Sequence, residues 1–391
     1  MEARKKRIEA LDILRGFALF GVLLVNLTMM HTSRTGFSVS RMGLEGINHL
    51  SALGIEVFFQ GKFYTIFSIL FGLGFFLFMN RKGKDIQSPE ALKPFFIRRM
   101  LALLFFGLLH MVFVWHGDIL HVYALIGLVL LWRKEKTEED LLRGVLIWLL
   151  IAAFITGVLN ALIEVPILFH AMVTSEMSPY ADSVYSGGSY WELLRFRLVH
   201  EVQNAPVDLV FILPKILGLF YLGFYLGRKK LFENLKDHRG TLLKTLRYSA
   251  AISLIMILGL LFFRPYTGGE NPYYTFAFLE GIFRETLTLS GSAFYISGLL
   301  LLLGKTPWKK ILNPLKYLGK TALSNYLIQT LFWSWVFNGY GLGFYGRLPY
   351  WSFFPLATAF FILQILLSKW WLSRWKTGPM EALWRRFTYG T

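Results

Sequence analysis

The residues that could do chemistry concentrate in the segment GLLHMVFVWHGDILHVYALIG. It holds His110, His116 and His121, three of the eight histidines in the chain, together with Asp118 and Tyr123. Imidazole exchanges protons near neutral pH, and a neighbouring carboxylate can orient it as a general base. The turn after the second histidine predicts a hairpin of two apolar helices with these groups near its tip. We therefore name His110, oriented by Asp118, as the candidate proton-transfer residue.

A structural role stays open for the same residues. Asp118 can cap the N-terminus of the second helix of the hairpin without any catalysis. Taken singly, His116 and His121 are typical turn residues. The spacing of the histidines differs from the i, i+4 spacing of a helical zinc pair, and the chain has no cysteine, so we expect no metal site.

A second group of polar residues lies on the first apolar run, in IEALDILRGFALFGVLLVN. At 100° per residue, Asp12, Arg15 and Asn26 fall within about 60° of one another, and the last two are separated by about 16 Å along a helix. All three must face protein or water. Either Asp12 and Arg15 form a structural ion pair, or Arg15 binds an anionic ligand near the cytoplasmic entrance.

Two further features suggest a ligand path. One is a polar stripe on a helix, at spacing i, i+3, i+4 and i+8, made of Thr321, Ser324, Asn325 and Gln329. Hydrogen bonds between helices explain such a stripe as well as a ligand path does. The other feature is Lys215, which follows Pro214 in the middle of an apolar run and either extends to the membrane surface or faces an aqueous cavity.

Ten apolar runs must position these groups. A helix needs about 17 to 25 residues to cross a hydrocarbon core, and several of the runs reach that length while two or three are short. They are Leu11 to Met30, Phe63 to Met79, Met100 to Trp115, Ile119 to Trp132, Val145 to Pro166, Pro206 to Gly227, Ala250 to Phe263, Thr286 to Leu303, Thr321 to Phe337 and Ser352 to Ser368.

The distribution of basic residues predicts the topology. Of the 41 lysines and arginines, 31 lie in six alternate segments between the runs, and the five segments on the other side hold eight. Basic segments stay in the cytoplasm, so we expect both termini there. The formal net charge of +17 is then a retention signal and an attraction to anionic headgroups, and we expect no nucleic-acid partner.

Composition sets the class of protein. With 55% hydrophobic and 17% charged residues, the chain leaves no room for a sizeable soluble domain. We predict an all-α polytopic membrane bundle of about ten spans that forms a single domain over residues 1–391. The outer segment 167–205 is expected to carry an interfacial helix, and residues 369–391 a cytoplasmic amphipathic tail. The N-terminus MEARKKRIEA is expected to precede a retained span rather than a cleaved signal peptide.

Several motifs resemble one family. GKFYTIFSILFGLGF, RRMLALLFFGLLH, WHGDILHVYALIGL, GKTALSNYLIQT, GLGFYG and GPMEALWRRFTYG occur in order along nearly the whole chain. Together they resemble the YeiB-like bacterial membrane proteins, a family labelled as a domain of unknown function. The resemblance implies a multi-pass protein of the bacterial plasma membrane.

That family is distantly similar to the transmembrane acyltransferases, which include the acyltransferase-3 and heparan-glucosaminide N-acetyltransferase branches. The resemblance implies acyl transfer from a cytosolic thioester to an acceptor on the far side. The acyltransferase-3 motif, an arginine followed after ten residues by histidine, falls here on Arg15 and Asn26. The heparan branch has asparagine at this point and a histidine in the following loop, for which His31 and His49 are the candidates.

The leading functional hypothesis is a membrane acyltransferase with acyl-CoA as donor and an outer-face hydroxyl or amine as acceptor. Arg15, with Asp12 and Asn26, would bind the donor, and His110 with Asp118 would move the proton. The alternatives are a transporter or flippase of a small anionic or lipid-like solute, and a non-catalytic membrane protein. We expect the lipid bilayer and a small-molecule, lipid or glycan acceptor as partners, and we leave open a homo-oligomer. A continuous tunnel with a histidine in it favours the enzyme, and two gated half-cavities favour the transporter.

Overall fold

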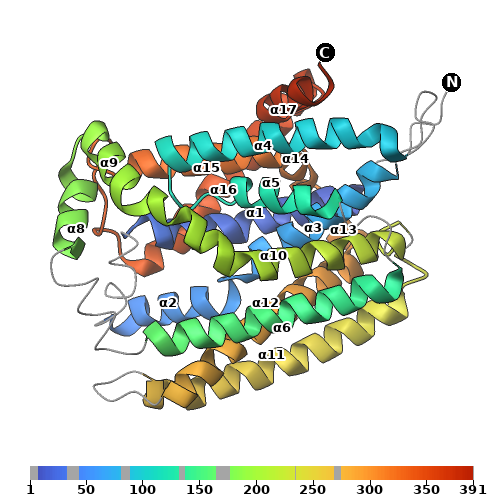
Figure 1. Cartoon of the computed structure of the whole chain (residues 1–391), viewed down its shortest axis with the longest axis horizontal. Helices are drawn as coiled ribbons and strands as arrows, with labels where there is room; N and C mark the ends of the chain where they lie inside the picture. The colour runs from blue at the N-terminus through green and yellow to red at the C-terminus, as the bar shows by residue number, and fades with distance from the viewer. Residues whose placement is uncertain are drawn as a thin grey trace.

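The computed structural model describes residues 8–32, 44–80, 89–131, 137–163, 177–233, 235–267 and 274–390. Within these ranges the chain is helical, without a strand, so the expected all-α polytopic bundle is confirmed. Figure 1 shows the long helices lying side by side along the longest axis of the molecule.

Each of the ten apolar runs coincides with one helix. These are α1 (Glu9–Met30), α3 (Lys62–Met79), α4 (Lys93–Phe113), α5 (Leu120–Leu130), α6 (Glu138–Ile163), α10 (Ala205–Arg228), α11 (Arg239–Thr267), α12 (Tyr274–Leu303), α15 (Ala322–Phe337) and α16 (Phe353–Arg374). Among the described residues, eight helices are long and apolar enough to cross a membrane. The other two of the ten, α5 with 11 residues and α15 with 16, are shorter.

Shorter elements lie between and after these helices. They are α2 (Gly46–Phe58), α8 (Met177–Gly187), α9 (Tyr190–Phe196), α13 (Thr306–Leu312), α14 (Leu315–Lys320) and α17 (Pro379–Tyr389), with single turns η2 (Pro89–Leu92), η6 (Val202–Asn204) and η7 (Tyr350–Ser352). The π-helical turn η5 (Arg197–Glu201) follows α9, and η6 then leads into α10. The described part of the outer segment 167–205, where an interfacial helix was expected, thus contains α8, α9, η5 and η6.

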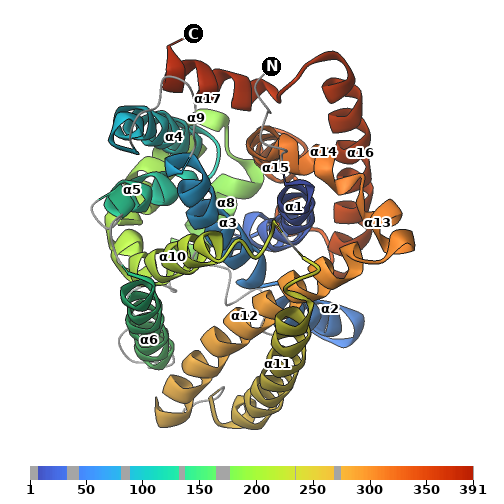
Figure 2. The same ribbon diagram turned by 90° about the vertical axis from the view of Figure 1, so that its right-hand side faces the viewer.

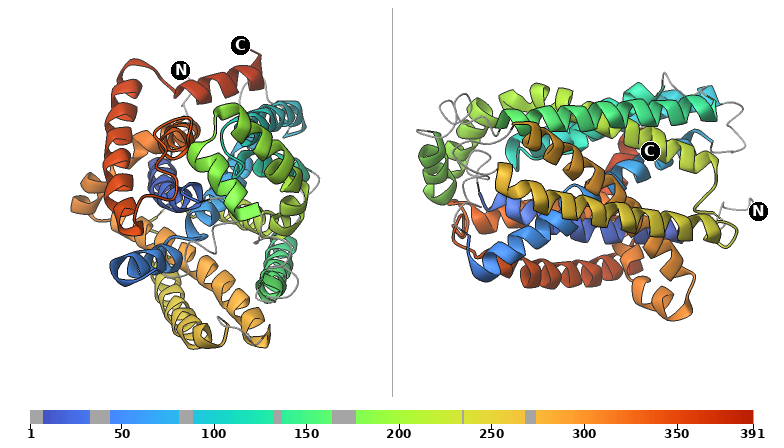
Figure 3. Two further views of the ribbon diagram at one scale, coloured as in Figure 1. Left: turned by 90° about the vertical axis from the view of Figure 1, so that its left-hand side faces the viewer. Right: turned by 90° about the horizontal axis from the view of Figure 1, so that it is seen from below.

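Helix α1 lies at the centre of the bundle, and Figure 2 shows it with α3, α14 and α15 around it. It packs against α14, α3, α15 and α16. The pair of α11 and α12 and the helix α6 lie at the periphery, as Figures 2 and 3 show. Only 11% of the most apolar stretch of α6, and of α11, is buried in the protein, against 61% for α1. Helices α6 and α11 therefore present apolar faces suited to lipid, while the centre holds the polar groups.

The two ends of the bundle differ. Helices α8 and α9 cover one end, as Figures 1 and 3 show. At the other end, α17 packs on the first half of α4, where Trp384 donates a hydrogen bond to the backbone oxygen of Arg99 at 2.7 Å. Because α1 and α4 both start at this end, we call it the inner end, in line with the expected cytoplasmic termini, and the end under α8 and α9 the outer end.

Two departures from regular helix lie inside the bundle. The span that ends at Met79 is broken between α2 and α3 by Phe59, Gln60 and Gly61, and the glycine adopts φ 81°, which favours glycine. After α4, residues 114–119 run back along the helix before α5 begins. A Cβ on Gly107 of α4 would lie 2.4 Å from the backbone nitrogen of His121, so α5 starts beside the penultimate turns of α4. Non-helical backbone at membrane depth is tolerated where it lines a cavity.

Candidate functional site

One cavity of about 1120 Å³ extends through the bundle. Its wall includes residues of the inner end such as Arg15 and Arg385, and residues of the outer end such as His116 and Glu280. Most of the remaining wall is aromatic or aliphatic. Both departures from regular helix line it, because residues 59–61 and 115–119 belong to its wall. This chamber brings together many of the charged groups inside the bundle.

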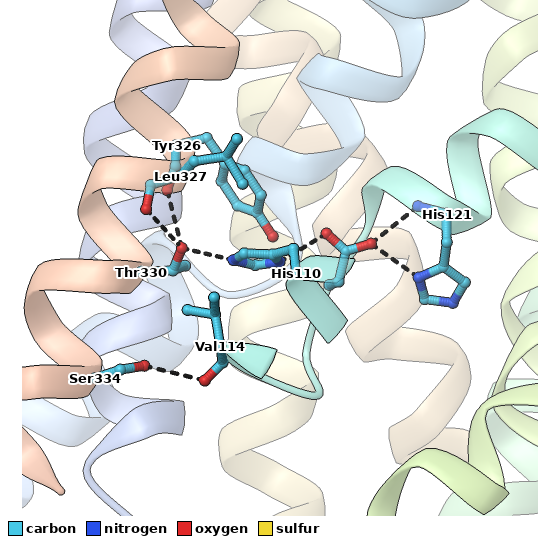
Figure 4. Close-up of polar contacts among 8 residues, drawn as sticks. His110, Val114, His121, Tyr326, Leu327, Thr330 and Ser334 are labelled. Carbon is cyan, nitrogen blue, oxygen red and sulfur yellow. Dashed lines mark hydrogen bonds and ion pairs between the residues drawn. The ribbon is translucent and has the colours of Figure 1, made fainter. Parts of the chain in front are cut away.

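Asp118 holds two histidines at once. Its Oδ1 lies 2.9 Å from His110 Nδ1, and its Oδ2 lies 2.8 Å from His121 Nδ1 (Figure 4). The backbone N–H of His121 donates to the same Oδ2 at 2.9 Å, which is the helix-capping contact. The capping role and the orienting role therefore coexist in one carboxylate. An ionised carboxylate only accepts hydrogen bonds, so both imidazoles carry their proton on Nδ1 when neutral.

The two imidazoles have different surroundings. His110 is 2% exposed, and its Nε2 lies 2.6 Å from the Thr330 hydroxyl, so both ring nitrogens are engaged within the protein (Figure 4). Asp118 and His121 line the cavity, whereas His110 is not among the described residues of its wall. The sequence-predicted pair is thus brought together as expected, but the imidazole beside the chamber is that of His121.

Gly107 makes this arrangement possible. A Cβ at this position would lie 2.4 Å from the backbone nitrogen of His121 and 2.9 Å from Asp118 Oδ2. Such contacts are too short for any real side chain, so α4 and the start of α5 approach each other only because residue 107 is glycine. The glycine sets the position of the carboxylate between the two histidines.

The residues predicted on the first span divide between the wall and the core. Asp12 Oδ1 accepts a hydrogen bond from Arg15 at 3.1 Å, so the ion pair exists. Asp12 is 1% exposed, whereas the side chain of Arg15 is 27% exposed and lines the cavity, as does Asn26. The ion pair and a ligand-facing guanidinium are therefore compatible.

Further cations gather at the inner mouth of the chamber. Arg99, Lys320 and Arg385 line it together with Arg15. The guanidinium of Arg99 stacks at 3.6 Å from the ring of Trp384 in α17, and the charges of Arg15 and Arg385 act on it directly. Sequence reasoning missed Lys320 and Arg385, because on the sequence they look like ordinary members of basic inner segments.

The predicted polar stripe on α15 forms hydrogen bonds between helices. Asn325 Nδ2 donates to Ser368 Oγ at 2.9 Å, and Gln329 Nε2 donates to Gln364 Oε1 at 2.8 Å, both on α16. Ser324 donates its hydroxyl proton to Glu381 of α17 at 2.6 Å. Of the described residues that line the cavity, none is a member of this stripe. The stripe was open to two explanations, hydrogen bonds between helices or a ligand path. The contacts that it makes are hydrogen bonds between helices.

Lys215 lies in the wall of the chamber and pairs with a residue that the sequence reasoning did not select. Its Nζ is 2.7 Å from Glu285 Oε2, and Lys62 lies nearby on the first turn of α3. The run expected to begin at Thr286 belongs to α12, which begins at Tyr274, so Glu285 falls inside a helix rather than in a loop. The apolar run that begins at Phe63 leaves Lys62 in an outer segment. In the structure Lys62 is instead buried inside the bundle, with 3% of its surface exposed.

His31 and His49 lie away from this group. His31 follows the last residue of α1, and its Nε2 accepts a hydrogen bond from the backbone N–H of Leu348 at 3.1 Å. Phe337 and Phe353 pack around the ring, and burial lowers the pKa of His31 to about 4. His49 lies on α2. Among the described cavity residues, neither histidine appears.

Fold and site together define a multi-pass α-helical membrane protein with a charged internal chamber. Residues 226–391 match a family described as protein of unknown function (DUF418). The chain is 30% identical to the uncharacterized protein YxaH of Bacillus subtilis, over 98% of this chain and 94% of the relative. It therefore belongs to this YeiB-like family.

Two further relatives extend the comparison. An uncharacterized 39.9 kDa protein in the amylase 3' region of Bacillus acidopullulyticus is 29% identical over 99% of this chain and 95% of its own length. The uncharacterized protein YeiB of Escherichia coli is 26% identical over 98% of this chain and 96% of its own length. No solved structure matches the chain.

Proposed function

We propose that this protein is a membrane acyltransferase, which moves an acyl group from a cytosolic acyl thioester such as acyl-CoA to a hydroxyl or amine acceptor in the chamber. The observation that carries the proposal is that one cavity joins the cationic inner mouth to an imidazole held by a carboxylate, His121 with Asp118. A chamber continuous between the two ends also favours an enzyme over two gated half-cavities.

The inner mouth supplies donor binding. Acyl-CoA is a phosphorylated thioester, and guanidinium groups bind phosphate with paired, charge-assisted hydrogen bonds. Arg15, Arg99 and Arg385 line the mouth, and Arg15 and Arg385 both lie within electrostatic range of Arg99. Like charges held so close are stabilised by an anion between them. The acyl chain would then extend into the apolar part of the chamber.

His121 supplies proton transfer. With its Nδ1–H donated to Asp118, its Nε2 is free of the ring proton and can accept one from the acceptor. His110 lies on the other side of Asp118. Its Nδ1 is hydrogen-bonded to the second carboxylate oxygen, and its Nε2 is hydrogen-bonded to the Thr330 hydroxyl. We therefore assign the base to His121 and a positioning role to His110, which refines the pairing of His110 with Asp118 expected from the sequence.

The reaction balances without a further reagent. The acceptor oxygen or nitrogen attacks the thioester carbonyl carbon while its proton passes to His121 Nε2. The tetrahedral intermediate then expels the sulfur, and the C–S bond breaks as the new ester or amide bond remains. The imidazolium returns its proton to the thiolate, so a free thiol and a neutral imidazole are regenerated.

Turnover of a labelled thioester by the purified protein tests the proposal. In proteoliposomes supplied with radiolabelled acetyl-CoA and an acceptor extract, we expect label to appear in an acceptor and free thiol to be released. His121→Gln should lower turnover by about 10² to 10⁴, whereas His49→Gln, outside the described cavity wall, should not. Absence of both thioester binding and thiol release in the wild type would remove the enzyme proposal and favour transport of an anionic solute.

A further inference from the structure

A cluster of buried charges lies midway along the chamber, apart from the inner mouth. It consists of Lys62 on α3, Lys215 on α10 and Glu285 on α12, which are 3%, 7% and 4% exposed and all line the cavity. Three different helices thus direct ionisable groups to one place. Such groups inside a membrane protein are costly and are kept there for function.

The cluster contains two lysines but only one carboxylate. Glu285 pairs with Lys215 at 2.7 Å, whereas Lys62 donates to the backbone oxygen of Gln60 at 3.3 Å. Lys62 lies within electrostatic range of both members of the pair. Two lysines therefore share one carboxylate, and an anion bound beside Lys62 would stabilise the charged form of its side chain.

The break between α2 and α3 places the positive end of a helix beside Lys62. Lys62 is the first residue of α3, and Gly61, with φ 81°, turns the chain there and lines the cavity. The N-terminal end of this helix of 18 residues has no side-chain cap and carries partial positive charge, although the Lys62 N–H itself donates to the backbone oxygen of Phe59 at 3.2 Å. Broken helices that aim such ends at a chamber are a recurring means of binding anions in membrane proteins.

Glu285 adds a second requirement. Its Oε2 is paired with Lys215, but its buried Oε1 has no hydrogen-bond partner. An unpaired buried carboxylate oxygen is costly, and a hydroxyl or amine proton of a ligand would satisfy it. The cluster thus fits a ligand that combines an anionic group with a proton donor.

A chain of contacts relates this cluster to His121. Lys215 lies 4.9 Å from the ring centre of Tyr64, and the backbone oxygen of Tyr64 accepts a hydrogen bond from Tyr123 at 3.0 Å. Tyr123 follows His121 by two residues on α5. The cluster and the imidazole therefore line neighbouring levels of the same chamber.

We infer that Lys62, Glu285 and the N-terminal end of α3 bind a ligand of the glycerol phosphate type, in which an anionic group lies next to a hydroxyl. The anionic group binds Lys62 and the helix end, and the hydroxyl donates to Glu285 Oε1. Phe59, Phe63 and Phe67 line the chamber nearby and suit an attached acyl chain. Binding of this ligand does not depend on acyl transfer. Only its role as the acyl acceptor rests on the proposed function.

Ligand binding to the full-length protein in detergent, without any thioester present, tests the inference. The probes are lysophosphatidic acid, monoacylglycerol with the same chain, and glycerol 3-phosphate, and the readouts are the dissociation constant and the shift in thermal midpoint. Lysophosphatidic acid should bind at least about tenfold more tightly than neutral monoacylglycerol. Binding of glycerol 3-phosphate as well would identify a free metabolite as sufficient, and its failure would show that the chain is required.

Variants locate the binding. Lys62→Gln should weaken lysophosphatidic acid binding about tenfold or more and leave monoacylglycerol binding unchanged. Lys309→Gln, an exposed lysine of α13, should change neither. Equal affinity for the charged and neutral probes in the wild type, or unchanged binding in Lys62→Gln, would overturn the inference. If Lys62→Gln does not fold, the comparison of lysophosphatidic acid with monoacylglycerol on the wild-type protein still tests the inference. Because thioester turnover is measured separately, binding without turnover would refute the proposed function alone.

Discussion

The histidines near the outer end of the bundle are held in three different ways. His110 has both ring nitrogens engaged, by Asp118 and by Thr330, and lies behind the chamber wall. His121 shares the same carboxylate but faces the chamber. His116 Nδ1 lies 3.0 Å from Glu201 Oε2 under the outer cap. Which imidazole can act as a base is therefore decided by what occupies its second nitrogen.

Replacing the carboxylate between the histidines should separate orientation from binding. In Asp118→Asn, the amide nitrogen cannot accept from an Nδ1–H, so at least one imidazole takes the wrong tautomer. We expect kcat for thioester turnover to fall about 10² to 10⁴ and the KM for the donor to stay nearly constant, because the cationic mouth is untouched. A rise in donor KM with unchanged kcat would place Asp118 in binding instead.

His31 predicts a specific dependence of stability on pH. Burial lowers its pKa from 6.5 to about 4, so the unfolded state takes up the proton first and the folded state loses stability as pH falls from about 6.5 toward 4. Between pH 7 and pH 5 the loss is about 2 kcal/mol. Thermal unfolding in detergent should show it, and His31→Gln should remove this component. An identical pH dependence in the variant would mean that His31 does not titrate as proposed.

At the scale of elements, close approach of backbones sets the site. Gly107→Ala places a methyl group against His121 and Asp118 Oδ2 and should push α5 away from α4. We expect turnover to fall at least about tenfold, since a misplacement of about 1 Å is enough for such losses. Gly240→Ala, where no atom lies within 4 Å of the new Cβ, is the matched control. Full activity in Gly107→Ala would show that the packing there is not needed for catalysis.

The tail helix α17 gives a second test at this scale. Glu381 accepts hydrogen bonds from the backbone N–H groups of Leu323 and Ser324 and from the Ser324 hydroxyl, so it caps α15 from another helix. Glu381→Ala removes the cap and should destabilise the fold by about 1 kcal/mol. Differential scanning fluorimetry in detergent measures this, with Glu139→Ala on the exposed start of α6 as the control. Equal midpoints for the two variants would argue against the capping role.

Sequence periodicity predicted the elements well because apolar length is the main requirement for a span. It located all ten helices and the pairing of Asp118 with a histidine. It placed Lys62 and Glu285 outside the spans, because a charge next to an apolar run reads as the end of that run. Only packing against other helices shows that these charges lie inside. The same limit applied to the choice between His110 and His121, which depends on contacts between α4, α5 and α15.

At the scale of the whole molecule, the charge asymmetry predicts one orientation in the membrane. The chain has no cysteine, so single cysteines can be introduced without background. Ser183→Cys on exposed α8 should react with a membrane-impermeant maleimide in intact cells, and Lys309→Cys on α13 only after permeabilisation. The reverse pattern would invert the predicted topology and place the cationic mouth outside.

Access to the chamber from its two ends would distinguish an enzyme from a transporter. Asn26 lines the cavity on α1, whereas Leu150 is a lipid-facing residue of α6 with 60% of its surface exposed. In an enzyme with one continuous chamber, Asn26→Cys should react with a small charged methanethiosulfonate added on either side, while Leu150→Cys should not react. Acyl-CoA should slow the reaction from the inner side, where the cations bind it. Reactivity that switches from one side to the other with solute would indicate alternating access, and the transporter would then replace the enzyme as the function of this fold.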